Sequence, residues 1–135
     1  MNPVFPAVQT QEEFLSSALH IICLCAEWCR ACRDYHGTFE SLAKEFKAFR
    51  FVWVDIEEEA EALGDLDIEN FPTLLIRRQD WVLYFGVILP QPDHLHRLLK
   101  NFSKMTLDAC QDYAQSSEER LAWQNNPDII VLKAL

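Results

Sequence analysis

Two cysteines three positions apart, Cys29 and Cys32, stand where an apolar run gives way to a helical pattern. The run, Ile21–Cys25, is short and continuous, which is typical of a buried strand. Beyond the cysteines, apolar residues recur at helical spacing as far as Phe46. A Cys-x-x-Cys pair at a strand-to-helix junction is typical of a redox dithiol. This stretch therefore predicts both a local fold and a chemistry.

The two thiols are expected to have different roles. Cys29 would begin the helix, where free N–H groups and the helix dipole stabilise an anion. Because the thiolate is the nucleophile, we expect Cys29 to attack a substrate. Cys32 lies one turn further into the helix and can attack back to close a disulfide. Between them stand Arg30 and Ala31, and the cation of Arg30 should favour the Cys29 thiolate.

A second interpretation of the cysteines is a metal site. Cys-x-x-Cys is also half of many zinc sites, which need a second pair of ligands. The nearest candidates are Cys23 and Cys25, but both lie inside the apolar run and would share one face of a strand. Cysteine is among the most buried residue types, so two core thiols are the plainer interpretation. We therefore expect no metal and no cofactor.

The rest of the chain predicts one α/β domain. Its 135 residues are 50% hydrophobic, which is enough for a single domain with a core. Short apolar runs alternate with helical patterns, as in the α/β class. The predicted strands are residues 21–25, 51–54, 73–76 and 81–85, and the predicted helices are residues 11–19, 29–46, 57–63 and 91–102. Gln79-Asp80 predicts a hairpin turn between the last two strands, without the usual glycine.

Four landmarks occur in an order and spacing that resemble the thioredoxin family. They are Ala26-Glu27-Trp28-Cys29, Asp55 at the end of a strand, Phe71-Pro72-Thr73, and Gly86 after the last strand. The resemblance covers roughly residues 5 to 103. It implies a thioredoxin-like fold, with a central mixed β-sheet flanked by helices and a C-terminal extension beyond it.

The resemblance also implies an activity and its residues. Cys29 and Cys32 would form the redox-active disulfide of a thiol–disulfide oxidoreductase. Pro72 would be cis beside this pair, and Phe71 backbone groups would pair with a substrate strand. Asp55 would accept a hydrogen bond from the Trp28 indole. The implied partners are disulfide-containing proteins and an upstream reductase.

Several residues depart from the family pattern. Arg30-Ala31 replaces the usual Gly-Pro, Gly37 replaces a helix-kinking proline, and Phe51 replaces a lysine. Cys23 occupies the position of a buried aspartate that is associated with proton transfer to the resolving thiol. A buried thiol is a poor substitute because burial raises its pKa. Water or Glu27 would then serve the resolving step.

His36, four residues after Cys32, is either a proton relay for that thiol or a solvated surface histidine. The departures indicate a divergent family member. They keep open a second function, a thioredoxin-fold binding module or assembly chaperone with weak or no redox activity.

Charge and cysteine usage indicate the setting. The formal net charge is −9, which argues against nucleic acid and anionic membranes as partners. Eight carboxylates and no Lys or Arg lie between Asp55 and Glu69, as a solvated face or as a surface that selects basic partners. The first ten residues lack the basic and apolar parts of a signal peptide. Five cysteines, an odd number, do not suggest a disulfide framework. We expect a cytoplasmic protein of cell redox homeostasis.

Residues 104–135 lie beyond the family resemblance. Ser116 with Glu119 predicts a capping box and a short helix, and Asn126-Pro127-Asp128 predicts a turn. Ile129–Leu132 is an apolar run with strand character. It would pack on its own domain, pair with a sheet edge, or support association with a partner or a second copy. Because the family core is complete by residue 103, a chain ending there should still fold.

Overall fold

The computed structural model describes residues 18–64, 66, 68–89 and 91–135. A four-stranded sheet runs through it in the order β2-β1-β3-β4. β1 pairs with β2 in parallel, and the other two pairings are antiparallel. The strands are β1 Leu19–Cys25, β2 Arg50–Asp55, β3 Thr73–Arg78 and β4 Trp81–Val87. All four predicted strands are present, each two residues longer than predicted, and Gly86 lies inside β4 instead of after it.

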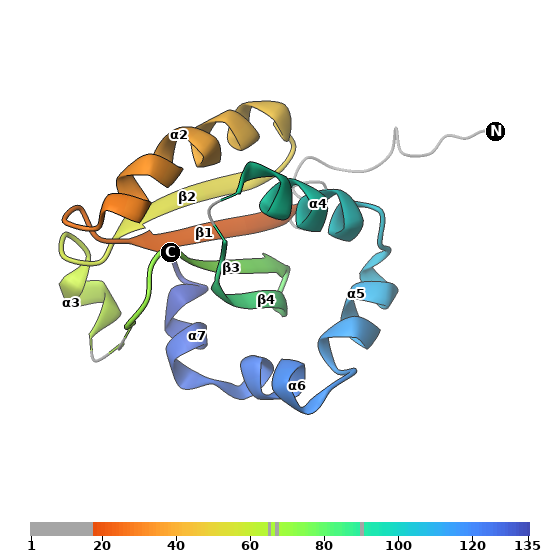
Figure 1. Ribbon diagram of the computed structural model, residues 1–135. Coiled ribbons are helices and arrows are strands. Elements are labelled where there is room, and N and C mark those ends of the chain that lie inside the picture. The colour runs from red at the N-terminus through yellow and green to blue at the C-terminus, as the bar shows by residue number, and fades with distance from the viewer. Residues whose placement is uncertain (1–17, 65, 67, 90) are drawn as a thin grey trace.

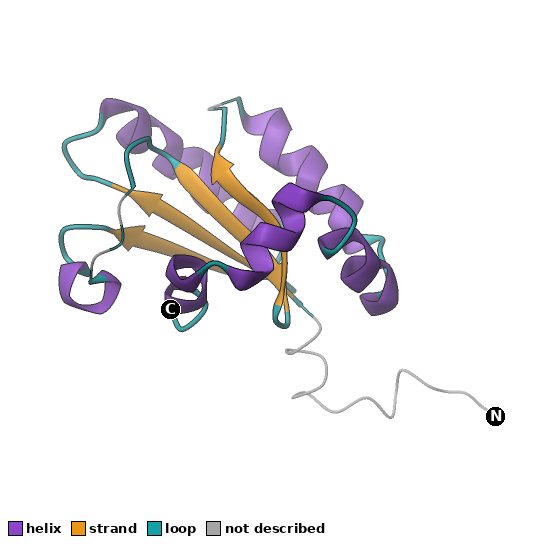
Figure 2. Cartoon of the chain, turned by 90° about the horizontal axis from the view of Figure 1, so that it is seen from below, coloured by secondary structure: helices purple, strands orange, loops and turns teal. Residues whose placement is uncertain are grey.

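Helices cover both faces of the sheet (Figures 1 and 2). They are α2 Arg30–Glu45, α3 Ala60–Leu63, α4 Pro92–Ser103, α5 Leu107–Ala114, α6 Glu118–Asn125 and α7 Pro127–Leu132. The mixed sheet with flanking helices confirms the predicted thioredoxin-like fold. The helix predicted over residues 11–19 falls outside the described residues except at its end, where Leu19 begins β1. Within the described residues, no helix is both long and apolar enough to cross a membrane.

Alternation along β1 divides the core into two clusters. Leu19, Ile21, Cys23 and Cys25 point to the face covered by α2 and α4, where they meet residues such as Tyr35 and Leu95. Ile22 and Leu24 point to the opposite face, which α3 and α7 cover. Successive residues of a strand face opposite sides, so two cysteines that are two positions apart point to the same side of the sheet. Cys23 and Cys25 therefore share one face, as predicted.

The β3–β4 hairpin turns at Gln79-Asp80, as predicted. Gln79 has a φ of 51°, which is the left-handed region where glycine is usual. The Arg77 guanidinium donates to the Gln79 carbonyl oxygen at 2.6 Å, a hydrogen bond that helps to hold the turn without a glycine.

The C-terminal helices α5, α6 and α7 follow one another around the β4 edge of the sheet (Figure 1). The side-chain amide of Gln124 in α6 pairs with both backbone groups of Val82: its Oε1 accepts from the N–H and its Nε2 donates to the carbonyl oxygen, each at 2.9 Å. A free edge strand invites pairing with another chain, and this amide occupies part of that edge. The Lys133 ammonium, at the end of α7, donates to the Asp80 carbonyl oxygen at 2.7 Å and links α7 to the β3–β4 turn.

The strand-like run at Ile129–Leu132 is helical, so the predicted strand character is wrong. Asn126 Oδ1 accepts from the Asp128 N–H at 2.8 Å as the N-cap, and Pro127 occupies the first turn. Asparagine caps and first-turn prolines favour helix starts. Ile129 and Leu132, three residues apart, then fall on one helical face and are completely buried. The preceding helix forms as predicted, although Ser117 and not Ser116 caps it.

Candidate active site

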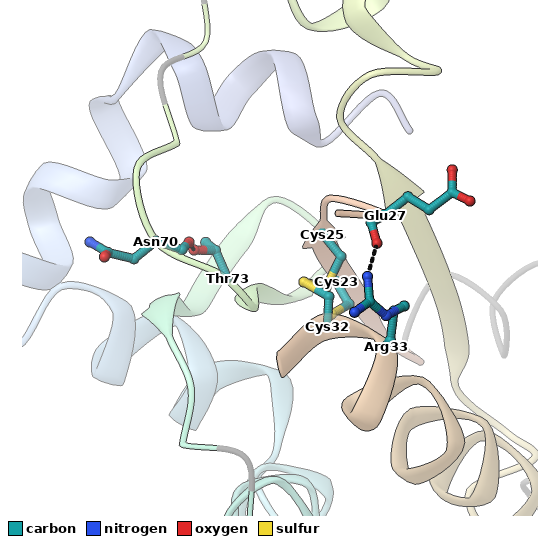
Figure 3. The surroundings of a disulfide bond; sticks show 7 residues. All are labelled: Cys23, Cys25, Glu27, Cys32, Arg33, Asn70 and Thr73. Atoms are coloured by element: carbon teal, nitrogen blue, oxygen red, sulfur yellow. Dashed lines mark hydrogen bonds between the residues drawn. A yellow bond between two sulfur atoms is a disulfide. The ribbon is translucent and has the colours of Figure 1, made fainter. Parts of the chain in front are cut away.

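The β1–α2 junction presents Cys29 as the N-cap of α2. The Cys29 N–H donates to the Ala26 carbonyl oxygen at 3.0 Å, which makes residues 26–29 a tight turn. The Arg33 guanidinium reaches back from α2 and donates to the Glu27 carbonyl oxygen at 2.9 Å (Figure 3). These contacts hold the turn against the helix, so the position of the first cysteine is fixed from both sides.

The two cysteines of the motif lie in different environments. Cys29 is partly exposed, and its side chain makes no capping hydrogen bond. Cys32 is one turn further along and 1% exposed, within the core between α2 and the sheet. The outer thiol can therefore meet a macromolecular disulfide, whereas the inner one is too deeply buried to do so.

The disulfide of the structure joins Cys25 to Cys32, and Cys29 is free. This differs from the predicted Cys29–Cys32 bond. Cys25 is the last residue of β1 and shares the core cluster of Cys32, and their Cα atoms are 5.7 Å apart, which is within the usual range for a disulfide. The sequence indicated where the side chain of Cys25 would point, but not that α2 would bring Cys32 to it.

Cys23 completes a group of three cysteines beneath the turn (Figure 3). Its Sγ lies 3.8 Å from that of Cys25, and the residue is fully buried. Burial raises the pKa of the Cys23 thiol far above its ordinary value, so this group stays protonated at neutral pH. The neighbouring Tyr35 phenol has a raised pKa for the same main reason. Among the described residues its hydroxyl has no hydrogen-bond partner.

Trp28 and Phe71 form an aromatic surface beside Cys29. The Trp28 side chain is 64% exposed, and its ring meets Phe71 edge to face at 5.7 Å between centroids. The Phe71–Pro72 peptide bond is cis. The Ile88 N–H donates to the Pro72 carbonyl oxygen at 3.1 Å, and the Thr73 hydroxyl donates to the Asn70 carbonyl oxygen at 2.6 Å. Both contacts hold this loop against the sheet.

The backbone of Phe71 is free to bind. Within the described part of the chain, neither its N–H nor its carbonyl oxygen has a hydrogen-bond partner. Unpaired backbone groups next to a pair of thiols can accept an extended peptide by strand addition.

Asp55 caps its own loop and makes no hydrogen bond to Trp28 in the described structure. Its Oδ1 accepts from the N–H groups of Glu57 at 2.8 Å and Glu58 at 3.2 Å. The predicted hydrogen bond from the Trp28 indole is therefore absent, because that ring turns outward to Phe71. The helix predicted from residue 57 begins only at Ala60.

The charged residues around the thiols are exposed. Arg30 Nε lies 3.8 Å from Asp34 Oδ2, and both side chains are mostly in solvent. Asp34 partly neutralises the charge of Arg30, and solvent screens the remaining effect of that charge on Cys29. Ala31, next in α2, is partly exposed. Arg30 is thus a weaker influence on Cys29 than its position in the sequence suggests.

A pocket of about 310 Å³ reaches Cys25 and Cys32 from the side of β2. Among its lining residues are Arg33, His36 and Asp55. The His36 ring packs edge to face on Trp53 at 4.7 Å between centroids and is about half exposed. His36 is thus exposed to solvent and also lines the pocket that reaches the sulfur atoms of Cys25 and Cys32. No group of three side chains in the described residues is arranged to hold a metal ion.

A mixed sheet, a Cys-x-x-Cys pair where β1 meets α2 and a cis-proline loop beside the pair are typical of the thioredoxin-like class of fold. The thioredoxin family model matches residues 6–85, and the chain belongs to the thioredoxin family. A thioredoxin of Chlamydia trachomatis is 28% identical over 95 residues, which are 68% of this chain and 93% of that protein. A relative in Arabidopsis thaliana is also 28% identical, over 79 residues, and the chain spans about half of its length.

Solved structures agree. The thioredoxin of Trypanosoma brucei brucei is 27% identical and has a TM-score of 0.58, covering 73% of this chain and 89% of that one. Family membership together with a cysteine pair at bonding distance supports a thioredoxin-like redox function.

Proposed function

We propose that this chain is a thiol–disulfide oxidoreductase that reduces or exchanges disulfides in protein substrates through Cys29 and Cys32. One observation carries the proposal: a partly exposed thiol caps α2, and a buried thiol lies one turn behind it. Helix N-termini stabilise anions, so Cys29 is the attacking group. The buried position of Cys32 suits a thiol that acts only on a neighbouring sulfur.

The reaction runs in two steps. An extended substrate segment lies along the free backbone of Phe71, with Trp28 against its side chains. The Cys29 thiolate attacks one substrate sulfur, and the other leaves as a thiolate that takes up a proton. Cys32 then loses its proton and attacks Cys29 Sγ, which releases the reduced substrate and forms the Cys29–Cys32 disulfide. An external dithiol or an upstream reductase returns the pair to thiols.

The pocket beside Cys32 offers a route for its proton. His36 and Asp55 line this pocket together with Cys32, and Cys23, at the family's aspartate position, holds its own proton at neutral pH. A reducing compartment such as the cytoplasm supplies the electrons that this direction requires.

Turnover of a protein disulfide tests the proposal. Insulin with dithiothreitol as the electron source should be reduced faster in the presence of the chain than without it. Cys29→Ser should abolish the acceleration, whereas Cys110→Ser, which removes a fully buried thiol far along the chain, should retain it. Equal rates with and without the wild-type chain would instead favour the binding-module function.

Reactivity of the thiols gives a second test. Iodoacetamide at neutral pH should modify Cys29 of the reduced protein before any other cysteine. Earlier modification of Cys32 would reverse the assigned roles.

A further inference from the structure

Cys32 has a cysteine neighbour at the candidate active site besides its partner in the motif. Cys32 lies between a partly exposed cysteine of its own motif, Cys29, and a buried one at the end of β1, Cys25. The proposed reaction uses Cys29 and Cys32 and gives Cys25 no role. Yet Cys25 is the residue that the structure joins to Cys32.

We infer that Cys25 is a second disulfide partner of Cys32, so that the oxidised chain holds its disulfide in an outer position, Cys29–Cys32, or an inner one, Cys25–Cys32. The inference rests on the proposed function, because substrate reduction supplies the outer disulfide. It makes Cys25 a further catalytic residue of this chain.

The fold lets Cys32 serve both partners. Cys29 and Cys32 are separated by one turn of α2, while Cys25 ends the strand that the first turn of α2 covers. The Cα atoms of Cys25 and Cys32 are 5.7 Å apart, so the inner bond needs no movement of the strand or the helix. Moving the disulfide inward therefore requires only a change in the partner of Cys32.

Proton transfer has a path at the same place. Cys25 and Cys32 both line the pocket of about 310 Å³, and the side chains of His36 and Asp55 line it too. Cys25 can lose its proton to this pocket while the rest of its surroundings stay apolar. On its other side, Cys25 has the protonated Cys23 at 3.8 Å between sulfurs, a neighbour that can donate a weak hydrogen bond to a thiolate.

The transfer is an exchange in which no electrons are gained or lost. The Cys25 thiolate attacks Cys32 Sγ, the Cys29–Cys32 bond breaks, and the Cys25–Cys32 bond forms. Cys29 leaves as a thiolate, and the proton given up by Cys25 balances the one that Cys29 can take up. The disulfide is then buried, and an oxidised chain again presents a free thiol at its surface.

This arrangement changes what the oxidised protein can do. With only an outer disulfide, the oxidised chain would have no accessible thiol, because Cys23, Cys25 and Cys110 are buried. With the inner disulfide, Cys29 can attack a second substrate and hold it as a mixed disulfide, which Cys32 is not free to resolve. The inner position thus converts a two-thiol reductant into a one-thiol exchanger.

Disulfide mapping of the full chain tests the inference. The reduced protein is oxidised with diamide and treated with light N-ethylmaleimide while folded. It is then denatured in heavy N-ethylmaleimide, so that buried thiols carry the heavy label and cannot exchange. Trypsin cuts after Arg30 and Arg33, and Glu-C cuts after Glu27. These cuts place Cys25, Cys29 and Cys32 on three different peptides.

The expected result is Cys32 joined mainly to the peptide that ends at Glu27, with the light label on Cys29. Fragmentation of that peptide should assign the bond to Cys25 and the heavy label to Cys23. If Cys32 is joined mainly to the Trp28–Arg30 peptide and Cys29 carries no light label, the inference is overturned.

Two variants sharpen the test. Cys25→Ser should move the disulfide to Cys29 and abolish the light label, and Cys110→Ser, the matched loss of a buried thiol, should leave the wild-type pattern. Insulin reduction is measured on the same protein preparations before they are oxidised and labelled. If the wild-type chain does not accelerate insulin reduction, the proposed function is refuted. The inner disulfide is decided by the mapping of the wild-type chain alone, even if the Cys25→Ser variant does not fold.

Discussion

The substitution Ile129→Ala tests whether the C-terminal helices belong to the core. Ile129 is completely buried in the cluster that includes Ile22, Leu75 and Val82, on the face of the sheet opposite α2. Its neighbour Ile130 belongs to the same helix and is 53% exposed. The chain thus provides a matched pair in which residue type, helix and change are the same and only burial differs.

The size of the effect follows from the burial. Ile129→Ala removes three buried carbons, each contributing about 0.8 kcal/mol, or about 2.4 kcal/mol in total. The cavity that remains in a sheet-backed cluster raises the loss to about 3–4 kcal/mol. Ile130→Ala should change the free energy of unfolding by less than about 0.5 kcal/mol.

Urea denaturation followed by tryptophan fluorescence measures both variants. With a slope of about 2 kcal/mol per molar urea, Ile129→Ala should lower the midpoint by about 1.5–2 M, and Ile130→Ala should leave it nearly unchanged. Equal midpoints for the two variants would show that α7 does not pack on the sheet. Deleting residues 104–135 removes the same contacts, so we now expect that truncated chain to be strongly destabilised.

Three further outcomes follow from the active-site geometry. If the family role of that carboxylate applies, Cys23→Asp should speed release of substrate from Cys29 in a trapped-intermediate assay. It should also lower the free energy of unfolding by about 3–5 kcal/mol, because the buried carboxylate has no partner. An unchanged release rate would show that protons leave by another route. Trp28→Ala should raise the KM for insulin about tenfold or more, as loss of an exposed aromatic anchor does, with the thermal midpoint unchanged, and an unchanged KM would exclude a binding role. Burial raises the pKa of the Cys23 thiol and of the Tyr35 phenol, so at high pH the folded state keeps protons that the unfolded state releases. The stability of the reduced protein should therefore fall as the pH rises above about 9. If Cys23→Ala shows the same pH dependence as the wild type, the Cys23 thiol makes no contribution.

Local patterns predicted the elements around the site because the signals there are short-range. The apolar run of β1, the cysteines and the amphipathic α2 are adjacent in the sequence, so their order predicts the junction. Alternation in β1 even predicted that Cys23 and Cys25 face the same side. The partner of Cys32 could not be predicted in this way, because it depends on how α2 lies across the strand.

The tail shows where composition misleads. Ile129–Leu132 is rich in β-branched residues, which favours a strand, yet two buried positions three apart suit a helical face equally well. Asn126-Pro127 decides between them as a cap followed by a first-turn proline. The sequence analysis assigned both residues to a turn, but in the structure they begin the helix α7. Gln124 gave no signal at all, since its role requires the β4 edge to be present.

Trapping of a mixed disulfide tests the central claim most directly. The Cys32→Ser variant, reduced and then mixed with insulin, should form a covalent complex that dithiothreitol releases, and peptide mapping should place the substrate sulfur on Cys29. The Cys29→Ser variant should form none. A substrate bound at any other cysteine, or no complex with Cys32→Ser, would contradict the account.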